Sequence, residues 1–313
     1  IGRARDAIHS VIFGQEDVVD LTLITILACG HGLLVGVPGL AKTKLVETLG
    51  TVLGLDARRV QFTPDLMPSD ILGSEILDET ADRRRSFRFV RGPVFAQLLM
   101  ADEINRASPR TQSALLQAMQ EHHVSVGGER HDLPKPFHVL ATQNPIEQEG
   151  TYPLPEAQLD RFMFLVDVGY PTAEEEVEIV KSTTGGSQPS LEKILSPEKI
   201  LALQTLVRRV PVPDHVVRYA VELVRHTRPK EPGVPDFIAK NVSWGAGPRA
   251  SQYLVLAAKA RAILNGRFVA SVEDVKAVAR PVLRHRVLPN FTAESEGTTS
   301  VKLVDQLVAL VKG

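Results

Sequence analysis

Cysteine is almost absent from the sequence, since Cys29 is the only one among 313 residues. A single thiol cannot form a disulfide within the chain. Cys29 ends an apolar run, and we expect it to be a small residue of the core. The lack of disulfides is typical of a reducing compartment, so the sequence predicts a cytoplasmic location.

Aromatic residues and net charge are also scarce. Phe, Trp and Tyr make up 5% of the chain, and the formal net charge is −1. Dedicated nucleic-acid grooves usually combine a basic surface with stacking aromatic side chains, so this composition argues against one. The near-zero charge also gives no general attraction to an anionic membrane surface.

A long hydrophobic run is missing as well. The most apolar stretch, residues 21–41, is divided by Gly30, His31, Gly32 and Pro38 into a helix, a strand and a turn. A helix needs about 20 consecutive apolar residues to cross a bilayer, so we exclude a membrane span. Hydrophobic residues nevertheless make up 43% of the chain, which is enough for a large globular core.

A turn rich in glycine and proline joins an apolar run at 32–35 to a helix-like run at 44–49. Strand, turn with Lys-Thr, and helix form the context of a phosphate-binding P-loop, whose backbone N–H groups and helix N-terminus attract an anion. Lys42 would reach the β and γ phosphates of ATP, and the Thr43 hydroxyl would bind Mg²⁺. The predicted nucleotide-binding residues are Gly36, Val37, Pro38, Gly39, Leu40, Ala41, Lys42, Thr43 and Lys44.

Ala41 departs from the usual P-loop pattern, which has glycine before the lysine. We expect this position to open the helix, where a small residue is needed but a positive φ is not, so that alanine is tolerated. The alternative interpretation of the segment is an ordinary strand-to-helix turn without a ligand, because short motifs also occur by chance.

Strands alternate with helices over the first half of the chain. We expect helices within 1–30, a short helix starting near Ser69, a helix starting at Ser108-Pro109 and a hairpin around Gly127-Gly128. Short strands are expected at 32–36, 60–62, 86–91, 137–142 and 162–166, while 95–101 fits a buried strand or a helix ending in one. This alternation predicts an α/β fold with a mostly parallel sheet.

Helical patterns dominate after Tyr170-Pro171. Candidate helices cover 173–182, 214–226, 249–265 and 271–284, with a further one beginning at Ser196-Pro197. Residues 183–190 are rich in Gly, Ser and Pro, as linkers are. We therefore predict an α/β nucleotide-binding core at 1–170, a linker at 171–190 and an all-helical domain at 191–313.

A second apolar run, residues 98–101, leads directly into Asp102 and Glu103. Mg²⁺ prefers carboxylate and water oxygens, so Asp102 would hold the ion, largely through water. Glu103 could polarise a water for in-line attack on the γ-phosphate. Acidic residues often follow strands, but together with a P-loop in the same α/β domain this pair predicts the Walker B strand of an ATPase.

Three further polar residues have two interpretations each. Asn144 could orient the attacking water, or it could cap the turn before Pro145. Arg161 could be functional, or it could pair with Asp160 or another acid. Arg249 follows a glycine-rich loop and could be functional, or it could lie on the surface at a helix start. The residues alone leave these alternatives open.

Together these segments resemble an AAA+ ATPase of the MoxR family, over nearly the whole chain. The matching segments are the P-loop at 36–43, Gln-Phe-Thr-Pro-Asp-Leu at 61–66, Ala-Asp-Glu-Ile-Asn-Arg-Ala at 101–107, Ala-Thr-Gln-Asn-Pro-Ile-Glu at 141–147, Tyr-Pro-Leu-Pro-Glu-Ala-Gln-Leu-Asp-Arg-Phe at 152–162, Gly-Pro-Arg-Ala at 247–250 and Leu-Arg-His-Arg at 283–286. Alanine before the P-loop lysine is typical of this family. Val35 stands where many members have glutamate, at a position away from the phosphates.

The resemblance implies a role for each of the three ambiguous residues. Asn144 is similar to sensor 1, Arg249 to sensor 2 on a helical lid, and Arg161 to an arginine finger that reaches the ATP of a neighbouring subunit. Such a finger contributes about 10³–10⁵ in rate, so an isolated subunit would be a poor ATPase. The family assembles as rings, commonly hexamers. Segments 73–93 and 124–133 resemble its helix-2 insertion and pre-sensor-1 hairpin, which usually face the ring pore or a client.

The leading interpretation is therefore a ring-forming ATPase that remodels a client protein or helps to insert a cofactor or metal. The resemblance also implies a partner with a von Willebrand factor A (VWA) domain. One alternative is a nucleic-acid-stimulated AAA+ motor, against which the composition argues. The other is a nucleotide-gated scaffold with slow hydrolysis, against which Asp102, Glu103 and Arg161 weigh.

Overall fold

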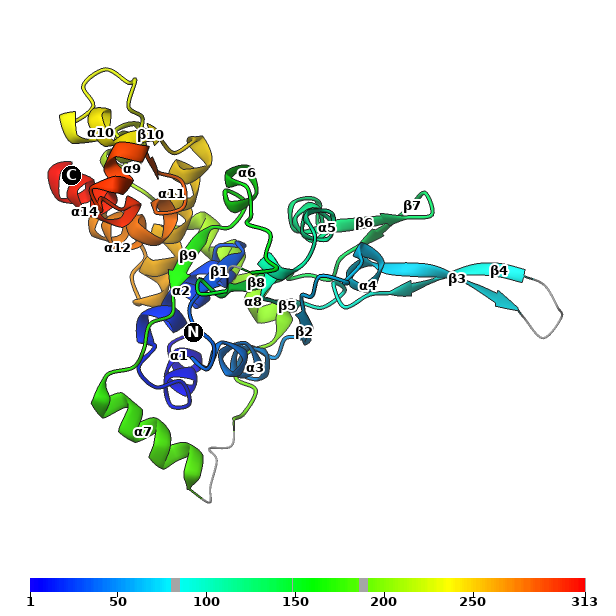
Figure 1. Ribbon diagram of the computed structural model, residues 1–313. Helices are drawn as coiled ribbons and strands as arrows, with labels where there is room; N and C mark the ends of the chain where they lie inside the picture. Colours follow the sequence, from blue (N-terminus) through cyan, green and yellow to red (C-terminus); the bar gives the residue numbers. More distant parts are fainter. Residues whose placement is uncertain (80–84, 148, 186–190, 313) are drawn as a thin grey trace.

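A five-stranded parallel sheet forms the centre of the molecule (Figure 1). The structure is a computed structural model that describes residues 1–79, 85–147, 149–185 and 191–312. The strand order is β2-β5-β8-β1-β9, with β1 (Gly32–Val35), β2 (Ala57–Gln61), β5 (Leu98–Asp102), β8 (His138–Gln143) and β9 (Phe164–Asp167). The predicted α/β fold with a parallel sheet is confirmed.

Helices connect these strands, because parallel neighbours require crossover connections. The connections contain α3 (Lys42–Leu53), α4 (Pro68–Leu72), the 3₁₀ turn η1 (Ile104–Arg106), α5 (Pro109–Glu121) and α6 (Glu156–Leu159), while α1 (Gly2–His9) and α2 (Glu16–Leu27) precede the first strand. The predicted start of α5 is confirmed, since the Ser108 hydroxyl accepts a hydrogen bond from the Thr111 N–H.

Two antiparallel hairpins extend from the sheet domain as an arm (Figure 1). β3 (Gly73–Glu79) pairs with β4 (Arg85–Arg91), and β6 (His123–Val126) pairs with β7 (Glu129–Asp132). Phe89 of β4 stacks on His131 of β7, which joins the two hairpins. The sequence predicts β4 but not β3, because charged residues interrupt the alternation of β3. Residues 80–84, within the predicted insertion, lie outside the described ranges.

Strand pairing also shifts two predicted boundaries. β2 and β5 pair residue by residue from Ala57↔Leu98 to Gln61↔Asp102. The strand predicted at 60–62 therefore starts three residues earlier and ends before Phe62. The ambiguous run at 95–101 becomes a strand that starts at Leu98, with no helix before it.

The apolar stretch at 21–41 folds as the end of α2, strand β1 and the loop before α3. Cys29 is exposed, which corrects the expectation that it belongs to the core. It lies where the chain turns from α2 towards β1 with a left-handed φ of +59°, and this turn leaves its side chain on the surface. In the described ranges no helix is long and apolar enough to cross a membrane.

The second half of the chain is helical with one small exception, and its helices after residue 210 gather as the lid (Figure 1). Its helices are α7 (Ala173–Thr184), α8 (Pro197–Arg209), α9 (Asp214–Arg225), α10 (Asp236–Asn241), α11 (Pro248–Leu264), α12 (Val272–Leu283), α13 (Phe291–Ser295) and α14 (Ser300–Leu310). A two-stranded ladder, β10 (Val242–Trp244) with β11 (Leu288–Pro289), was not expected. α7 fills much of the predicted linker, of which residues 186–190 lie outside the described ranges.

Two hydrophobic clusters cover the two faces of the sheet. Successive strand residues point to opposite faces, so Leu98 belongs to one cluster and Leu99 to the other. The cluster that contains Leu98 continues into the lid, where it includes Leu254 of α11 and Val278 of α12. The lid therefore packs against the same apolar layer that supports one face of the sheet.

Candidate active site

Neighbouring strands of the sheet end at one edge, and predicted site residues follow them. β1 leads into the loop at 36–41, β5 ends at Asp102 beside Glu103, and β8 leads into Asn144. In open parallel sheets, ligands bind at the carboxyl ends of the strands. The edge holds a pocket of about 520 Å³ lined by Pro38, Gly39, Leu40, Ala41, Lys42, Thr43, Lys44, Glu47, Arg59, Asp102, Glu103 and Asn144. Of the predicted loop residues, Gly36 and Val37 lie outside this lining.

Two glycines shape the loop at 36–41 for different reasons. A Cβ on Gly36 would lie 2.5 Å from the backbone oxygen of Val168, so no larger residue fits there. Gly39 has φ +84°, and apart from its two chain neighbours no described residue has an atom within 4 Å of the position that its Cβ would take. Gly39 therefore serves the left-handed turn and leaves the centre of the loop open to a ligand.

Ala41 corrects the expectation for the residue before the lysine. It lies directly before α3 with φ +54° and ψ +17°, in the left-handed region. The position does require a positive φ, which explains why the usual P-loop pattern has glycine. With a Cβ, this conformation costs about 1 kcal/mol or more. Alanine is thus accommodated at an energetic cost.

Lys42 folds back onto its own loop. Its Nζ donates to the backbone oxygen of Gly36 and, at 3.3 Å, to that of Val37. Burial lowers the pKa of the Lys42 ammonium, while the nearby carboxylates of Asp102 and Glu103 oppose that effect. An anion in the pocket would offer this partly desolvated cation a stronger partner than two backbone oxygens.

Asp102 is 8% exposed and held by two neighbours. Arg59 of β2 donates to Asp102 Oδ2 from Nε at 3.0 Å and from Nη2 at 2.5 Å, and the Thr142 hydroxyl of β8 donates to Oδ1 at 2.5 Å. These contacts fix the carboxylate at the end of β5 without covering the pocket side, since Asp102 still lines the pocket.

Glu103 is braced in a turn with φ +54°. Its N–H donates to the Thr142 hydroxyl at 2.8 Å. Its Oε2 accepts from Gln61 Nε2 at 2.7 Å and from Arg106 Nη1 at 3.0 Å. The carboxylate therefore lies at the pocket, with its Oε2 held by two donors from its own chain and its Oε1 outside these contacts.

Asn144 combines both interpretations of the sequence. Its Oδ1 accepts from the Ile146 N–H at 3.2 Å, which is the turn-capping contact. Its Nδ2 is buried and has no hydrogen-bond partner among the described residues. Because an unpaired buried donor is costly, this amide is suited to a ligand or water in the pocket.

Arg161 lies at the amino ends of the parallel strands, opposite the end that holds the pocket. It precedes β9, which runs parallel to β1 from Gly32↔Phe164 to Val35↔Asp167. The loop at 36–41 follows the end of β1, so the length of a strand, roughly 13 Å for four residues, separates the two. Within the described residues, Asp160 pairs with Arg249 and Arg286 rather than with Arg161.

Arg249 lies at this far edge too. It belongs to the first turn of α11, and its Nη1 donates to Asp160 Oδ2 at 2.7 Å. It does not line the pocket of Lys42. The structure thus brings together the loop, Asp102, Glu103 and Asn144, and it keeps Arg161 and Arg249 apart from them.

Arg59, Gln61 and Thr142 are site residues that the sequence analysis missed. All three contact Asp102 or Glu103 from neighbouring strands. The only signal is positional: Arg59 and Gln61 are two residues apart on β2, so both face the same side beside the end of β5. That signal depends on strand register, which the sequence alone did not supply.

The donors around the pocket suit a magnesium-bound triphosphate. The Thr43 hydroxyl and the Asp102 carboxylate offer oxygen ligands, while Lys42 and the N-terminus of α3 offer positive charge. Throughout the described residues there is no cluster of three or more His, Cys, Asp or Glu side chains that could hold a metal. An ion here would therefore also need phosphate and water oxygens, as Mg²⁺ with nucleotides does.

Two segments match known domain families. Residues 31–164 match the ATPase family associated with various cellular activities (AAA), and residues 237–307 match the AAA lid domain. The first segment contains most of the parallel sheet and the pocket of Lys42. The second contains α11, α12 and Arg249. The chain therefore contains an AAA core and an AAA lid, while the domain boundaries given above remain a prediction.

Relatives that match over nearly all of the chain carry the family's name. The chain is 44% identical to Chaperone MoxR1 of Mycobacterium tuberculosis, over 99% of this chain and 81% of that protein. It is 33% identical to Protein MoxR of Paracoccus denitrificans, over 91% of this chain and 87% of that protein. A crystal structure of a candidate ATPase from Cytophaga hutchinsonii covers 99% of this chain and 93% of its own, with TM-score 0.91 and 40% identity. The chain belongs to the MoxR family of AAA ATPases.

Proposed function

We propose that this protein binds and hydrolyses ATP with Mg²⁺ in a hexameric ring of identical subunits, and that hydrolysis drives remodelling or activation of a client protein. One observation carries the proposal. The loop at 36–41, Asp102, Glu103 and Asn144 share one pocket, while Arg161 and Arg249 share the opposite edge of the molecule. Two half-sites of this kind fit together only between subunits.

Each residue of the pocket has a role in this proposal. Lys42 and the loop N–H groups bind the phosphates, and Thr43 and Asp102 hold Mg²⁺, with Asp102 acting through water. When bound, Mg²⁺ would neutralise charge on the phosphate oxygens. The Asn144 Nδ2, buried and unpaired, would orient the attacking water.

Glu103 would accept a proton from that water. Gln61 and Arg106 both hold Oε2 of its carboxylate, so Oε1 can accept the proton while these contacts remain. Removal of Glu103 should therefore affect hydrolysis far more than binding.

Arg161 and Arg249 would act on the nucleotide of a neighbouring subunit. Arg161 cannot reach the loop at 36–41 of its own chain, because β9 and β1 are parallel and the two lie beyond opposite strand ends. Arg249 is joined to the same edge through Asp160. The isolated subunit would then be a slow ATPase.

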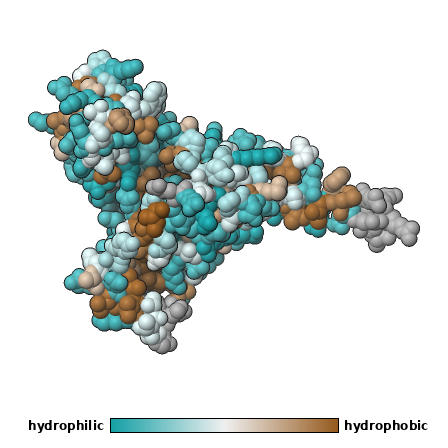
Figure 2. Space-filling model, in the orientation of Figure 1, coloured by the Kyte–Doolittle hydropathy of each residue, from teal (hydrophilic) through white to brown (hydrophobic). Residues whose placement is uncertain are grey.

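A client is proposed from two sources. A relative is named as a chaperone. The arm of β3 and β4 also exposes apolar side chains, with Leu77 55% and Phe87 72% exposed, and Figure 2 shows hydrophobic surface on this arm. We propose that the arm contacts the client. We also propose that a VWA-domain protein is a partner, that the client's activation includes insertion of a cofactor or metal, and that the protein acts in the cytoplasm.

A Glu103→Gln variant tests the hydrolytic role. Its rate of Mg²⁺-dependent ATP hydrolysis should fall at least about 100-fold, because general-base catalysis contributes about 10²–10⁴. Its affinity for a fluorescent ATP analogue should stay within about threefold, since Glu103 is not asked to bind phosphate. Glu174→Gln, which changes an exposed acid of α7 outside the arm and the pocket, is the matched control. Undiminished turnover in Glu103→Gln would refute the assignment.

A mixing experiment tests the role of Arg161. Arg161→Ala subunits added to wild-type protein should lower activity by more than their share, because each removes the finger from a neighbour's site. A loss that is only proportional to the added variant would show that Arg161 does not act in trans.

A further inference from the structure

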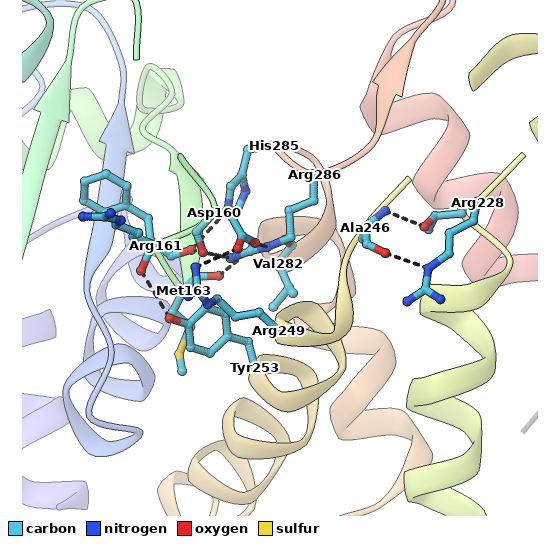
Figure 3. A network of polar contacts seen from close by, with 12 residues as sticks. Asp160, Arg161, Met163, Arg228, Ala246, Arg249, Tyr253, Val282, His285 and Arg286 are labelled. Carbon is cyan, nitrogen blue, oxygen red and sulfur yellow. Dashed lines mark hydrogen bonds and ion pairs between the residues drawn. The ribbon is translucent and has the colours of Figure 1, made fainter. Parts of the chain in front are cut away.

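Side chains of the lid bind the chain segment that carries Arg161, and we call this set of contacts the clasp. This segment, residues 160–163, lies between α6 and β9. Four lid side chains contact it: Arg249 and Tyr253 from α11, and His285 and Arg286 from the turn after α12 (Figure 3). The short piece of backbone before β9 thus joins core and lid.

Asp160 is the centre of this clasp. Its Oδ2 accepts from Arg249 Nη1 at 2.7 Å, and its Oδ1 accepts from Arg286 Nε at 2.7 Å. One carboxylate therefore binds two guanidinium groups from two different helical segments of the lid. Figure 3 shows Asp160 between these two arginines.

Arg286 holds the backbone as well as the carboxylate. Its side chain is 2% exposed, and its Nη2 donates to the backbone oxygens of Asp160 at 2.8 Å and Phe162 at 2.7 Å. Its Nη1 lies 3.3 Å from the backbone oxygen of Met163. A buried guanidinium with a full set of acceptors fixes the path of these residues.

The lid contacts Arg161 through the backbone oxygen of this residue. The Tyr253 hydroxyl donates to the Arg161 backbone oxygen at 3.2 Å. Among the described residues no ion pair involves the Arg161 guanidinium. The clasp therefore orients the base of the side chain and leaves its charged end available.

We propose that Asp160 is a positioning residue for hydrolysis in the neighbouring subunit. Through Arg249 and Arg286 it locks the Arg161 turn and the first turn of α11 into one rigid edge, so that both arginines meet the neighbour's nucleotide in register. This inference rests on the proposed function, in which Arg161 and Arg249 act in trans. It adds that their alignment, rather than their mere presence, depends on a carboxylate that never touches the nucleotide.

Steady-state kinetics of Asp160→Asn give the first test. The variant should lose roughly 10-fold to 100-fold in kcat, because small misplacements of a catalytic group cost about that much. Its KM for ATP and its affinity for an ATP analogue should change less than about threefold, since Asp160 lies beyond the opposite end of the strands from Lys42. Intact nucleotide binding also shows that the variant is folded.

Complementation separates a trans role from a local one. Asp160→Asn subunits have an intact pocket but misplaced Arg161 and Arg249. Glu103→Gln subunits have a defective pocket but correctly placed arginines. Mixing the two inactive variants should restore ATPase activity, because intact halves meet at some interfaces. Arg161→Ala mixed with Glu103→Gln is the parallel arm that tests the proposed function itself.

The outcomes are distinguishable. If Arg161→Ala complements Glu103→Gln and Asp160→Asn does not, the positioning role of Asp160 is wrong and the trans function stands. If neither complements, the trans function fails and this inference fails with it. Full kcat in Asp160→Asn would also overturn the inference.

Two more variants guard against a trivial loss of fold. Asp167→Asn is the matched control, because Asp167 also joins the core to the lid, through Arg284, but from the other end of β9; its kcat should be unchanged. Tyr253→Phe removes only the hydroxyl that holds the Arg161 backbone and should lower kcat a few-fold at constant KM. If Asp160→Asn does not fold, full kcat in Tyr253→Phe refutes the inference.

Discussion

At the residue scale, two positions of the pocket hold a backbone conformation that their side chains disfavour. Ala41 and Glu103 both have φ +54°. Such residues cost of order 1–3 kcal/mol each and concentrate at functional sites. At Glu103 the cost is offset by the hydrogen bond to Thr142 and by the brace from Gln61. At Ala41 the side chain has no polar group with which to offset it.

Ala41→Gly should therefore stabilise the protein. Glycine adopts the left-handed conformation without a Cβ clash, and we expect the free energy of unfolding to rise by about 0.5–1 kcal/mol. Urea denaturation measures the change. Ala277→Gly, on the exposed side of α12, is the matched control and should lower the free energy of unfolding by about 1 kcal/mol. A loss of stability in both variants would contradict a strained Ala41.

Two buried histidines should make stability depend on pH. Burial lowers the pKa of His31 to about 3 and that of His138 to about 4. Unfolded histidines titrate near about 6.5, so below that pH the unfolded state binds more protons. The stability from each neutral histidine is full above about pH 6.5. It falls with pH down to the folded pKa, by up to roughly 1.4 kcal/mol per unit.

Urea unfolding of His138→Gln between pH 7 and pH 5 measures this slope. The variant should show a shallower loss of stability with falling pH than the wild type. His215→Gln, in an exposed residue of α9, should leave the slope as it is. Equal slopes in all three proteins would exclude His138 as a source.

Most of the residues that the sequence predicts for the site, and that the structure places at the pocket, are adjacent in the chain. The loop at 36–43 and the pair Asp102-Glu103 are contiguous, so their chemistry can be recognised without a structure. Arg59 and Gln61 matter only because β2 pairs with β5 in one register, and Asp160 only because the lid returns to it. Contacts of that kind depend on packing between distant segments.

At the element scale, helices with strong start signals were predicted well. Ser108 before α5 and Ser271 before α12 both accept a hydrogen bond from the backbone of the first turn. The strands β3 and β10 gave no such signal, because β3 is rich in charge and β10 has three residues. Their existence depends on a partner strand rather than on their own sequence.

The first turn of α12 contains a buried carboxylate whose loss should be costly. Asp274 is fully buried and accepts from Arg261 at 2.6 Å and from Arg267 at 2.7 Å. Burial alone would raise its pKa, but hydrogen bonds from Arg267, Ser271 and Arg261 outweigh it and lower the pKa to about 2. Its stabilising effect is full above about pH 4 and is lost as the pH falls through 2.

Asp274→Asn should lower the free energy of unfolding at pH 7 by roughly 3 kcal/mol, because it leaves two arginines without their anion. Glu273→Gln changes the preceding acid, which is 76% exposed and, among the residues that the structure describes, forms an ion pair with Lys276 alone. That control should stay within about 0.5 kcal/mol of the wild type by the same denaturation assay. Comparable losses in the two variants would contradict the buried network.

At the scale of the whole molecule, the core and the lid share one hydrophobic cluster. It runs from Ala4 of α1 through Met100 of β5 to Leu307 of α14. The sequence predicted a boundary at 171–190 from composition, and that division remains a prediction. The shared cluster could not be foreseen, because it depends on which helix faces the lid turns to the sheet.

Core and lid should therefore unfold together. Amide hydrogen exchange of β8 and of α12 should show protection that disappears in a single cooperative step with added denaturant. The expected opening free energies of the two elements agree within about 1 kcal/mol. Loss of protection in α12 well before β8 would show that the lid is an independent unit.

The parallel alignment of β1 and β9 gives each molecule a direction. The loop of Lys42 lies beyond one end of these strands and Arg161 beyond the other. A two-fold dimer apposes identical patches, so it cannot bring the two opposite ends together at both sites at once. If Arg161 acts in trans as proposed, a head-to-tail row of n molecules completes n − 1 sites and leaves one pocket without an arginine. Only a closed circle gives every molecule both a donor and a recipient.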